Sequence, residues 1–380
     1  MRGLVGDRPL DCRRIRGCGR RFNRRVRRGG RLSGPFLRDS PVALALKKRA
    51  WAAIIEVMPI ADEAQARLAE IEDLQLLPHA PLARYTRFAI GGDADLYAET
   101  GSVDAFIAAL AAAKEAGIET VVIGDGTNLI ASDDGFRGLV LRYRGDRISA
   151  GGTAVSAEAG AALQALVDFA NQRGLRGLET LAGIPGSVGA AIYGNAGAYG
   201  HSISERVEQV RFFDGATVRC FRNAQCGFLY RESVFKSNKV WIIFSAELKL
   251  DSADADSLRK ISADIVKARN EKFPVTMKCA GSIFKNLLWK DLPAEVAAEV
   301  PESAVREGKV PAAWFLEQVG AKGAQRGEIH VATYHANLIY NAGSGTARDL
   351  RTLIGELKRR VRERFGIDLE EEVQYVGRFD

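Results

Sequence analysis

The feature that most constrains this chain is a dense run of glycines between residues 183 and 200. Gly183–Gly189 reads GIPGSVG, and Asn195–Gly200 follows it with NAGAYG. Glycine loses more conformational freedom on folding than any other residue, so this density indicates a backbone that must approach something closely. Backbone N–H groups in a turn or at a helix start can surround a phosphate. Tight turns between strands are the alternative explanation.

A second glycine turn lies upstream and favours the phosphate interpretation. Gly124–Asn128 reads GDGTN and follows Thr120–Ile123, which has the apolar character of a buried strand. Two glycine turns beside strands are typical of a site for a large ligand that carries phosphate.

The net charge of +7 is concentrated in the first 57 residues. These hold 16 Lys or Arg against four acidic residues, which gives +12 and leaves −5 for the rest of the chain. Such a leader is typical of a nucleic-acid or lipid-binding arm or of an organelle-targeting segment. We favour a third interpretation, in which residues 1–57 are disordered or not translated and Met58 is the start.

The periodicity of the remaining chain predicts an α+β protein. Apolar residues recur at helical spacing in five segments, and short apolar or alternating runs predict strands between them. The expected helices are 62–73, 103–116, 161–172, 257–270 and 346–365. The expected strands are 94–98, 120–123, 138–143, 210–213, 217–221 and 241–245.

Several common chemistries lack their motifs. No GxGxxG follows a strand, and there is no GxxxxGK[ST], HExxH or GxSxG. The five cysteines form no CxxC pair and match no zinc-site or disulfide spacing, so we expect reduced thiols, no metal and a cytoplasmic setting.

Eight motifs in a fixed order resemble one family. They are Thr86–Gly92, Ile123–Leu129, Gly183–Gly189, Asn195–Gly200, Tyr230–Lys236, Ala280–Asn286, His335–Asn337 and Leu369–Val373. From about residue 80 onward, the chain resembles the UDP-N-acetylenolpyruvoylglucosamine reductases, the MurB flavoenzymes of peptidoglycan precursor synthesis.

The resemblance implies a fold, a cofactor and a domain division. It implies an FAD-binding region of the vanillyl-alcohol-oxidase/PCMH type over residues 58–251. A smaller α+β MurB C-terminal substrate domain is expected over residues 252–380. FAD would be bound non-covalently, with its pyrophosphate against the two glycine turns. NADPH and the UDP-sugar would use one open face in turn.

The same resemblance implies three catalytic residues. Ser282 matches the proton donor of the Gly-Ser-x-Phe-Lys-Asn motif, and Arg231 matches the arginine that holds the substrate carboxylate. Glu372 matches the glutamate before valine, which would polarise or protonate the enolate. Glu370 and Glu371 directly precede it, and an acidic surface run is the alternative interpretation.

Further residues carry binding roles by resemblance. Substrate contacts are expected from Tyr230, Lys285, Asn286 and Gln318. Cofactor contacts are expected from Gly124, Gly126, Thr127, Asn128, Leu129, Gly183, Ile184, Pro185, Gly186, Ser187, Gly189, Asn195, Ala196 and Gly197.

The chain departs from the family at a few positions. Asp125 stands where glycine is usual, and its carboxylate would repel a pyrophosphate, so we expect it to point away from the ligand. Thr127 replaces serine and keeps the hydroxyl. Only 51 residues separate Arg231 from Ser282. This gap resembles the shorter type of the family, which lacks an inserted closing loop.

Two rival functions differ in class. One is an oxidase of small alcohols on the same FAD-binding architecture, although no histidine lies inside either glycine turn. The other is a nucleic-acid binder that acts through the leader, which the −5 charge of the body disfavours. We therefore expect small-molecule partners, no nucleic acid, no membrane and a monomer.

Overall fold

The computed structural model describes residues 62–379. The basic leader, the proposed start at Met58 and Asp380 therefore lie outside the described residues. Between residues 62 and 379, no helix is long and apolar enough to cross a membrane.

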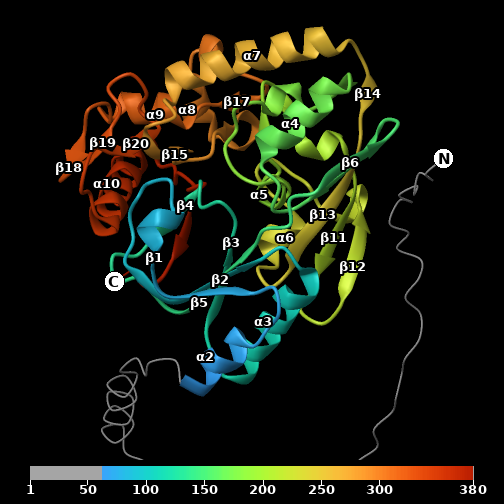
Figure 1. Cartoon of the computed structure of the whole chain (residues 1–380). Coiled ribbons are helices and arrows are strands. Elements are labelled where there is room, and N and C mark those ends of the chain that lie inside the picture. Colours follow the sequence, from blue (N-terminus) through green and yellow to red (C-terminus); the bar gives the residue numbers. More distant parts are fainter. Residues whose placement is uncertain (1–61, 380) are drawn as a thin grey trace, which may run out of the picture. The chain divides into compact units, whose positions relative to one another are not determined.

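The first sheet has four strands in the order β1-β2-β5-β3 (Figure 1). The β1–β2 pair is antiparallel, whereas β2 and β3 both run parallel to β5. Helix α3 (Val103–Glu115) packs against this sheet, capped by Ser102 and ended by Gly117 in the left-handed region. The strands are β1 (Gln75–Pro81), β2 (Asp93–Thr100), β3 (Thr120–Ile123) and β5 (Phe136–Tyr143).

The second sheet has five antiparallel strands in the order β12-β11-β13-β7-β6. It shares one hydrophobic core with α3, with the first sheet and with helix α4 (Leu163–Gln172). The strands are β6 (Ile148–Gly151), β7 (Ala154–Glu158), β11 (Val207–Phe213), β12 (Val218–Arg222) and β13 (Ile242–Lys249). Shorter elements of this region are α2 (Asp62–Ala69), α5 (Val188–Tyr193), α6 (Val234–Ser237), β8 (Leu175–Arg176), β9 (Gly197–Ala198), β10 (His201–Ser202) and β14 (Asp251–Ser252).

A third sheet and three helices build a separate core in the C-terminal part. The sheet order is β15-β20-β19-β18, and helix α10 (Ala347–Phe365) buries its apolar stripe against it. The elements are β15 (Lys278–Ser282), β18 (Gln325–Arg326), β19 (Ile329–Val331), β20 (Leu338–Asn341), α8 (Ala294–Glu299) and α9 (Ala312–Gln318), with the small ribbon β16 (Leu287–Leu288) and β17 (Lys309–Val310).

The secondary structure predicted from periodicity is confirmed. All five expected helices and all six expected strands are present, with their ends shifted by a few residues. The largest shifts are at the ends of β13, which continues to Lys249, and of α2, which ends at Ala69 rather than Asp73. Asp73 has a φ of 62°, and this left-handed conformation is incompatible with a continued helix.

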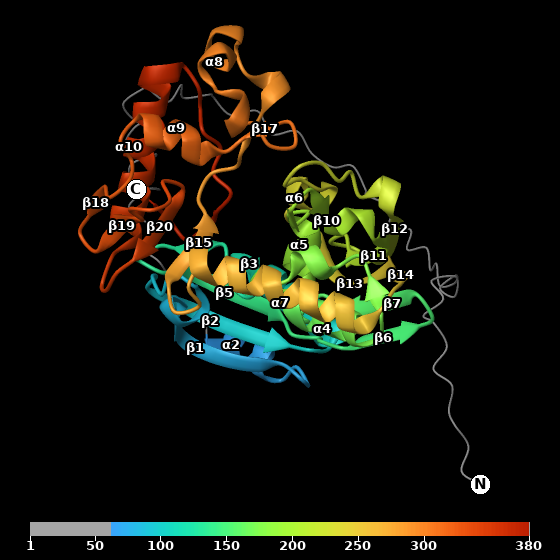
Figure 2. The same ribbon diagram turned by 90° about the horizontal axis from the view of Figure 1, so that it is seen from above.

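Helix α7 (Ala255–Lys272) lies along α4 in both views (Figures 1 and 2). Asn171 of α4 donates a hydrogen bond from Nδ2 to Ser262 Oγ at 2.7 Å. Ile265 and Val266 pack on the core of the first two sheets. The domain division expected at residue 252 places this helix in the C-terminal domain. Its packing favours a division after α7, at about residue 273, and we propose that boundary instead.

The end of the chain returns to the N-terminal part. Strand β21 (Gln374–Val376) pairs in parallel with β4 (Leu129–Ala131), which directly follows the first glycine turn. Asn341 supports the same junction, because its buried Nδ2 donates to Phe88 O at 3.0 Å. The C-terminal part is therefore joined to the N-terminal part by a strand pairing and a buried hydrogen bond, as well as by the chain connection.

The stability of the N-terminal core depends on an aromatic cluster between its two sheets. Phe106 is fully buried and meets the rings of Tyr143 and Phe244 edge to face, with centroids 6.0 and 5.5 Å away. We expect Phe106→Ala to lower the free energy of unfolding by about 3–5 kcal/mol, measured by denaturant titration. The control Leu77→Ala removes a half-exposed side chain and should change it by less than about 0.5 kcal/mol. Equal effects of the two variants would contradict this account.

Candidate active site

The two predicted glycine turns lie against each other. Thr127 Oγ1 donates to Pro185 O at 3.4 Å. A Cβ placed on Gly186 would lie 2.9 Å from Thr127 Oγ1, and one on Gly126 would lie 1.7 Å from Tyr85 O. Gly126 also has a φ of 65°, in the left-handed region. The carbonyl of Tyr85 leaves no room for a side chain at Gly126, and Gly186 has a φ of 119°, so backbone packing and conformation explain these two glycines. The two turns together are called the cradle below.

The cradle has polar groups that fit a dinucleotide cofactor. Among the residues that the structure describes, the backbone N–H groups of Gly126 and Thr127 donate to no protein acceptor. Asn128 Oδ1 is buried and lacks a hydrogen-bond partner, although Asn128 Nδ2 is occupied. Buried polar atoms are rarely left unpaired in native proteins, and a bound group that both accepts and donates hydrogen bonds would satisfy them. The residues present therefore fit FAD.

Three other predicted cofactor residues support the two turns through contacts within the protein. Ser187 is buried and caps α5, accepting a hydrogen bond from Ala190 N at 3.3 Å. Gly189 lets α5 approach Ala159, the residue after β7, because a Cβ on Gly189 would lie 2.9 Å from the Cβ of Ala159. Leu129 begins the strand that pairs with the end of the chain.

Asp125, the unusual residue of the first turn, is neutralised within the protein. Its carboxylate forms an ion pair with Arg142 of β5, and both side chains are partly buried. Burial alone would lower the pKa of Arg142, but Asp125 and Tyr97 outweigh it and raise that pKa. The ion pair offsets the repulsion that Asp125 would otherwise exert on a bound phosphate.

Arg231 and Glu372, two of the three predicted catalytic residues, are in contact. Arg231 Nε lies 2.9 Å from Glu372 Oε1. The Nε–H is not directed along this contact, so the pair is ionic rather than a well-aligned hydrogen bond. Arg231 has a φ of 58°, a left-handed conformation that is uncommon for a side chain of this size and is typical of a constrained functional position.

Ser282 is held next to this pair by the backbone. The Glu372 N–H donates to Ile283 O at 2.7 Å, immediately after Ser282. Gly281 has a φ of 76°, and the pairing of β15 with β20 changes register between Cys279 and Ser282. Within the described chain, Ser282 Oγ has no hydrogen-bond partner. Its hydroxyl proton is therefore not committed to another group.

The segment Asn195–Gly200 positions Arg231 and the residues before it. Gly197 O accepts a hydrogen bond from Arg231 Nη2 at 2.9 Å. Asn195 is buried, and its Nδ2 donates to Leu229 O at 2.8 Å, two residues before the arginine. We predicted cofactor contacts for Asn195, Ala196 and Gly197. The contacts present within the protein orient Arg231, and a cofactor role for these three residues stays a prediction.

The three adjacent glutamates of the C-terminal motif each pair with a different cation. These pairs bear on which of the three is the catalytic glutamate. Glu370 pairs with Lys285, Glu371 with Lys358 at 2.7 Å, and Glu372 with Arg231. Only Glu372 meets the predicted catalytic arginine. This supports our assignment over its two neighbours.

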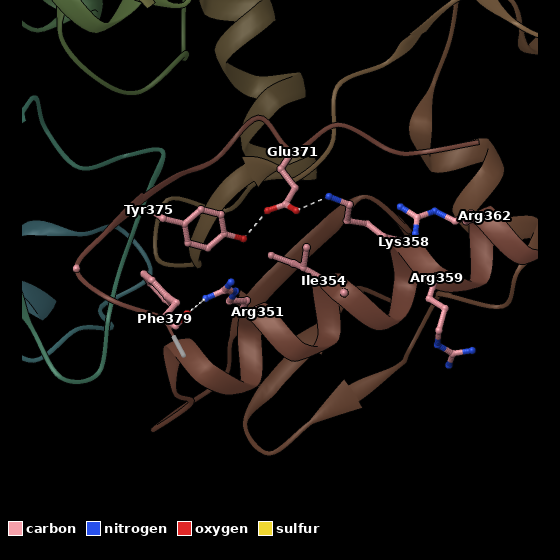
Figure 3. A pocket seen from close by; sticks show the side chains of 10 residues that line it. Arg351, Ile354, Lys358, Arg359, Arg362, Glu371, Tyr375 and Phe379 are labelled. Atoms are coloured by element: carbon pink, nitrogen blue, oxygen red, sulfur yellow. Dashed lines mark hydrogen bonds and ion pairs between the residues drawn. The ribbon is translucent and has the colours of Figure 1, made fainter. Parts of the chain in front are cut away.

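Glu371 faces a groove on the outer side of α10 (Figure 3). The groove has a volume of about 570 Å³, and its charged side chains pair with partners inside the protein. Glu371 also accepts a hydrogen bond from Tyr375 OH. The contacts of Glu371 with Lys358 and Tyr375 therefore hold the segment that carries Glu372. None of the three predicted catalytic residues lines the groove. Its lining residues are Arg351, Ile354, Gly355, Lys358, Arg359, Arg362, Glu371, Tyr375, Gly377 and Phe379.

The predicted substrate residues differ in how the structure places them. Tyr230 OH accepts from Asn286 N at 3.3 Å, and Asn286 Oδ1 accepts from Ala312 N at 3.3 Å, so these two lie together beside Arg231. Lys285 is buried, and its Nζ contacts Glu232 Oε1 at 2.5 Å as well as Glu370. Gln318 is exposed at the end of α9, and no contact among the described residues joins it to the others.

Burial would lower the pKa of Lys285, but its two carboxylate partners outweigh that effect and raise it. The ammonium group is therefore held firmly charged and is already satisfied by the protein. Its role as a substrate contact stays a prediction.

Asn337, the last residue of the His335–Asn337 motif, is a positioning residue for the segment that follows Ser282. It is buried, and it clasps Phe284 by accepting from the backbone N at 2.9 Å and donating to the backbone O at 2.8 Å. Here a side chain takes the place of a neighbouring strand as the hydrogen-bond partner of a backbone, and the spacing of residues in a sequence does not reveal such a role. The clasp fixes the chain two residues beyond Ser282.

His335 predicts a pH dependence of stability. Burial and the positive charge of Lys272 lower its pKa to about 4, and its Nδ1 accepts a hydrogen bond from Asn337 N at 3.2 Å. The unfolded chain, with a histidine pKa near 6.5, binds the proton more readily. Stability is thus fully present above about pH 6.5 and falls as the pH drops toward 4, by on the order of 2 kcal/mol.

Denaturant unfolding at several pH values measures this effect. The variant His335→Asn should flatten the dependence between pH 6.5 and 4, whereas the exposed His79→Asn should keep the wild-type slope. A wild-type slope in His335→Asn would contradict the assignment.

Comparisons with known proteins agree on one family. A family model described as "UDP-N-acetylenolpyruvoylglucosamine reductase, C-terminal domain" matches residues 273–376, and one described as "FAD binding domain" matches residues 94–220. A UDP-N-acetylenolpyruvoylglucosamine reductase from Solibacter usitatus is 68% identical over 311 residues, covering 82% of this chain and all of that protein. One from Bacillus subtilis is 34% identical, covering 82% of this chain and 97% of the relative.

A solved structure supports the same result. The reductase from Thermus caldophilus is 27% identical to this chain, with a TM-score of 0.62. The match covers 80% of this chain and 99% of that one.

Proposed function

The chain belongs to the UDP-N-acetylenolpyruvoylglucosamine reductase family, and from that premise we propose that Arg231, Ser282 and Glu372 form its catalytic centre. The protein is an FAD-dependent oxidoreductase that reduces UDP-N-acetylenolpyruvoylglucosamine to UDP-N-acetylmuramate in peptidoglycan precursor synthesis, with NADPH as reductant. The rival interpretation as an oxidase of small alcohols is not favoured by these relatives.

The observation that carries the proposed centre is the convergence of three segments that are distant in sequence. Arg231 lies 2.9 Å from Glu372, whose backbone N–H is bonded to Ile283 O beside Ser282. The carbonyl of Glu372 accepts from Asn128 Nδ2 at 2.7 Å, which joins the centre to the first glycine turn. A surface salt bridge would not require these backbone attachments on both sides.

Arg231 and Glu372 are proposed to handle the charge of the substrate. When bound, FAD supplies the hydride that reaches the terminal carbon of the enolpyruvyl group. Negative charge then builds on the substrate carboxylate as an enolate. The guanidinium of Arg231 stays charged and can hold that carboxylate in place, and Glu372 polarises the enolate together with it.

Ser282 is proposed to complete the reduction as general acid. Its Oγ–H bond breaks as the proton moves to the carbon next to the carboxylate, which forms the new C–H bond of the lactyl ether. The resulting alkoxide recovers a proton from solvent. A serine hydroxyl is a weak acid, but an enolate carbon is basic enough to accept its proton.

The cofactor and substrate assignments made from resemblance are retained as proposals. The glycine turns and Asn128 would hold FAD, and Tyr230 and Asn286 would contact the UDP-sugar beside Arg231. We further propose a cytoplasmic monomer whose partners are small molecules rather than nucleic acid or membrane.

The assigned activity predicts a coloured protein with two separable half-reactions. The purified protein should show the visible absorption of bound FAD, and anaerobic NADPH should bleach it. Enolpyruvyl-UDP-N-acetylglucosamine should then restore the colour, whereas a small alcohol should not reduce the flavin. A protein that cannot be loaded with FAD would overturn the assignment.

The proton-donor role predicts a selective defect in Ser282→Ala. Reduction of the flavin by NADPH should remain close to wild type, while the enolpyruvyl half-reaction slows by about 10²–10⁴-fold, as expected for loss of a positioned general acid. Stopped-flow absorbance measures both steps. The exposed Ser149→Ala is the matched control and should leave both unchanged. Equal slowing of both half-reactions would contradict the role.

A further inference from the structure

A buried lysine connects the segment of Ser282 with the turn that carries Arg231. Lys285 lies three residues after Ser282, and only 7% of its side chain is exposed. Its Nζ contacts Oε1 of Glu232 at 2.5 Å, and Glu232 directly follows Arg231 in the sequence. The ammonium group therefore lies where two of the segments of the proposed centre meet.

The turn that carries Arg231 has a constrained backbone that needs such support. Leu229 and Glu232 exchange backbone hydrogen bonds of 3.1 and 3.2 Å, so the four residues form a tight turn. Arg231 is the third residue of this turn and has a φ of 58°, at a position where glycine is usual. Lys236 Nζ donates to Arg231 O at 3.0 Å and to Glu232 Oε1 at 2.8 Å. Burial alone would raise the pKa of Glu232, but Lys236 and Lys285 outweigh that effect and lower it.

The same lysine also reaches the segment of Glu372. Lys285 Nζ forms an ion pair with Glu370, and Lys285 N donates to Glu370 O at 2.9 Å. The bond from Glu372 N to Ile283 O at 2.7 Å continues this backbone pairing. Side chains two residues apart in an extended segment lie on the same side of it. By holding Glu370, Lys285 therefore fixes the side to which Glu372 is directed.

We propose that Lys285 is a positioning residue that holds Arg231 and Glu372 in place relative to Ser282. Among the described residues, no other lysine forms ion pairs with both of the segments concerned. The inference rests on the proposed function, because it takes these three residues as the catalytic centre. The alternative is the substrate contact that resemblance predicts for Lys285. Two carboxylates already occupy its ammonium group, which favours positioning over a contact with an anionic substrate.

The first test separates the rate of reduction from substrate binding in FAD-loaded Lys285→Met. The maximal rate of the enolpyruvyl half-reaction should fall by about 10- to 100-fold, because a displacement of about 1 Å is enough to misalign the reacting groups. The dissociation constant of enolpyruvyl-UDP-N-acetylglucosamine and the rate of flavin reduction by NADPH should stay within about 2-fold of wild type. Stopped-flow absorbance with varied substrate concentration gives all three values.

The matched control for this test is Lys322→Met. Lys322 forms a partly exposed ion pair with Glu317 at 3.0 Å, so the variant also removes a lysine from a carboxylate and should leave all three values unchanged. Substrate binding that is weaker by about 10-fold or more in Lys285→Met, with an unchanged maximal rate, would identify a substrate contact and overturn the proposal.

A double-mutant cycle tests whether Lys285 acts through Glu232. Glu232→Gln should slow the same half-reaction selectively, and the double variant with Lys285→Met should be within about 3-fold of the slower single variant, because the two groups belong to one contact. The exposed Glu208→Gln is the control and should match wild type. Effects of Lys285→Met and Glu232→Gln that multiply in the double variant would contradict the proposal.

A conservative variant separates positioning from general damage to the fold. Lys285→Arg keeps the positive charge that the two carboxylates hold, so it should recover most of the maximal rate lost in Lys285→Met. The FAD content and the denaturant midpoint of each variant are measured in parallel. If Lys285→Met does not fold, Lys285→Arg and Glu232→Gln provide the same comparison of rate with binding. A folded Lys285→Arg that is as slow as Lys285→Met would contradict the role of the charge.

The proposed function and this inference fail in different ways. If Ser282→Ala slows both half-reactions equally, the proposed centre fails and the inference fails with it. If Ser282→Ala shows its selective defect while Lys285→Met and Glu232→Gln keep wild-type maximal rates, only the inference fails.

Discussion

The hydrogen bonds between Asn128 and the segment 372–374 are the connection on which the proposed site depends. Asn128 Nδ2 donates to Glu372 O at 2.7 Å, and the Asn128 carbonyl accepts from Gln374 N at 2.9 Å. One residue of the cofactor turn therefore fixes the backbone on both sides of the segment that carries Glu372. These two bonds fix the backbone around Glu372 relative to the first glycine turn, and so they limit where its ion pair with Arg231 can lie.

Charged side chains that support the fold are paired within the protein, whereas some charged side chains near the proposed site are not. The carboxylates of Glu370, Glu371 and Asp125 each have a cation of their own within the protein. These ion pairs fix the segments that carry the three carboxylates, and they cancel the negative charge of the carboxylates near the cradle. Within residues 62–379, no carboxylate forms an ion pair with Arg269, which lies beside Gly183, or with Arg87, whose backbone N–H donates to Gly126 O, so positive charge remains near the cradle. In a partly buried site, that charge attracts an anionic ligand more strongly than it would in water.

Much of the secondary structure could be predicted because it depends on residues that are close together in the sequence. The helices α3 and α10 follow from apolar residues at helical spacing, a Ser or Thr cap and a terminal glycine. The glycine turns were recognisable because close backbone approach leaves glycine as the only option. The resemblance to a known family then supplied the three residues that the structure brings together.

What the sequence could not show is mostly long-range. Nothing in the residues of β21 indicates that they pair with β4, some 240 positions earlier, because strand patterns do not name their partners. The apolar stripe of α7 predicts a buried face but not which core buries it. The run of Glu370, Glu371 and Glu372 became interpretable only when each side chain could be matched with its own cation.

The return of the C-terminal strand has a consequence for biosynthesis. The cradle borders on β4, and β4 lacks its parallel partner until residues 374–376 have been made. During translation the strands of the first two sheets precede β21 by more than a hundred residues, so β4 has no parallel partner until residues 374–376 have left the ribosome. A product that stops before residue 374 would lack the strand that pairs beside the cofactor turn.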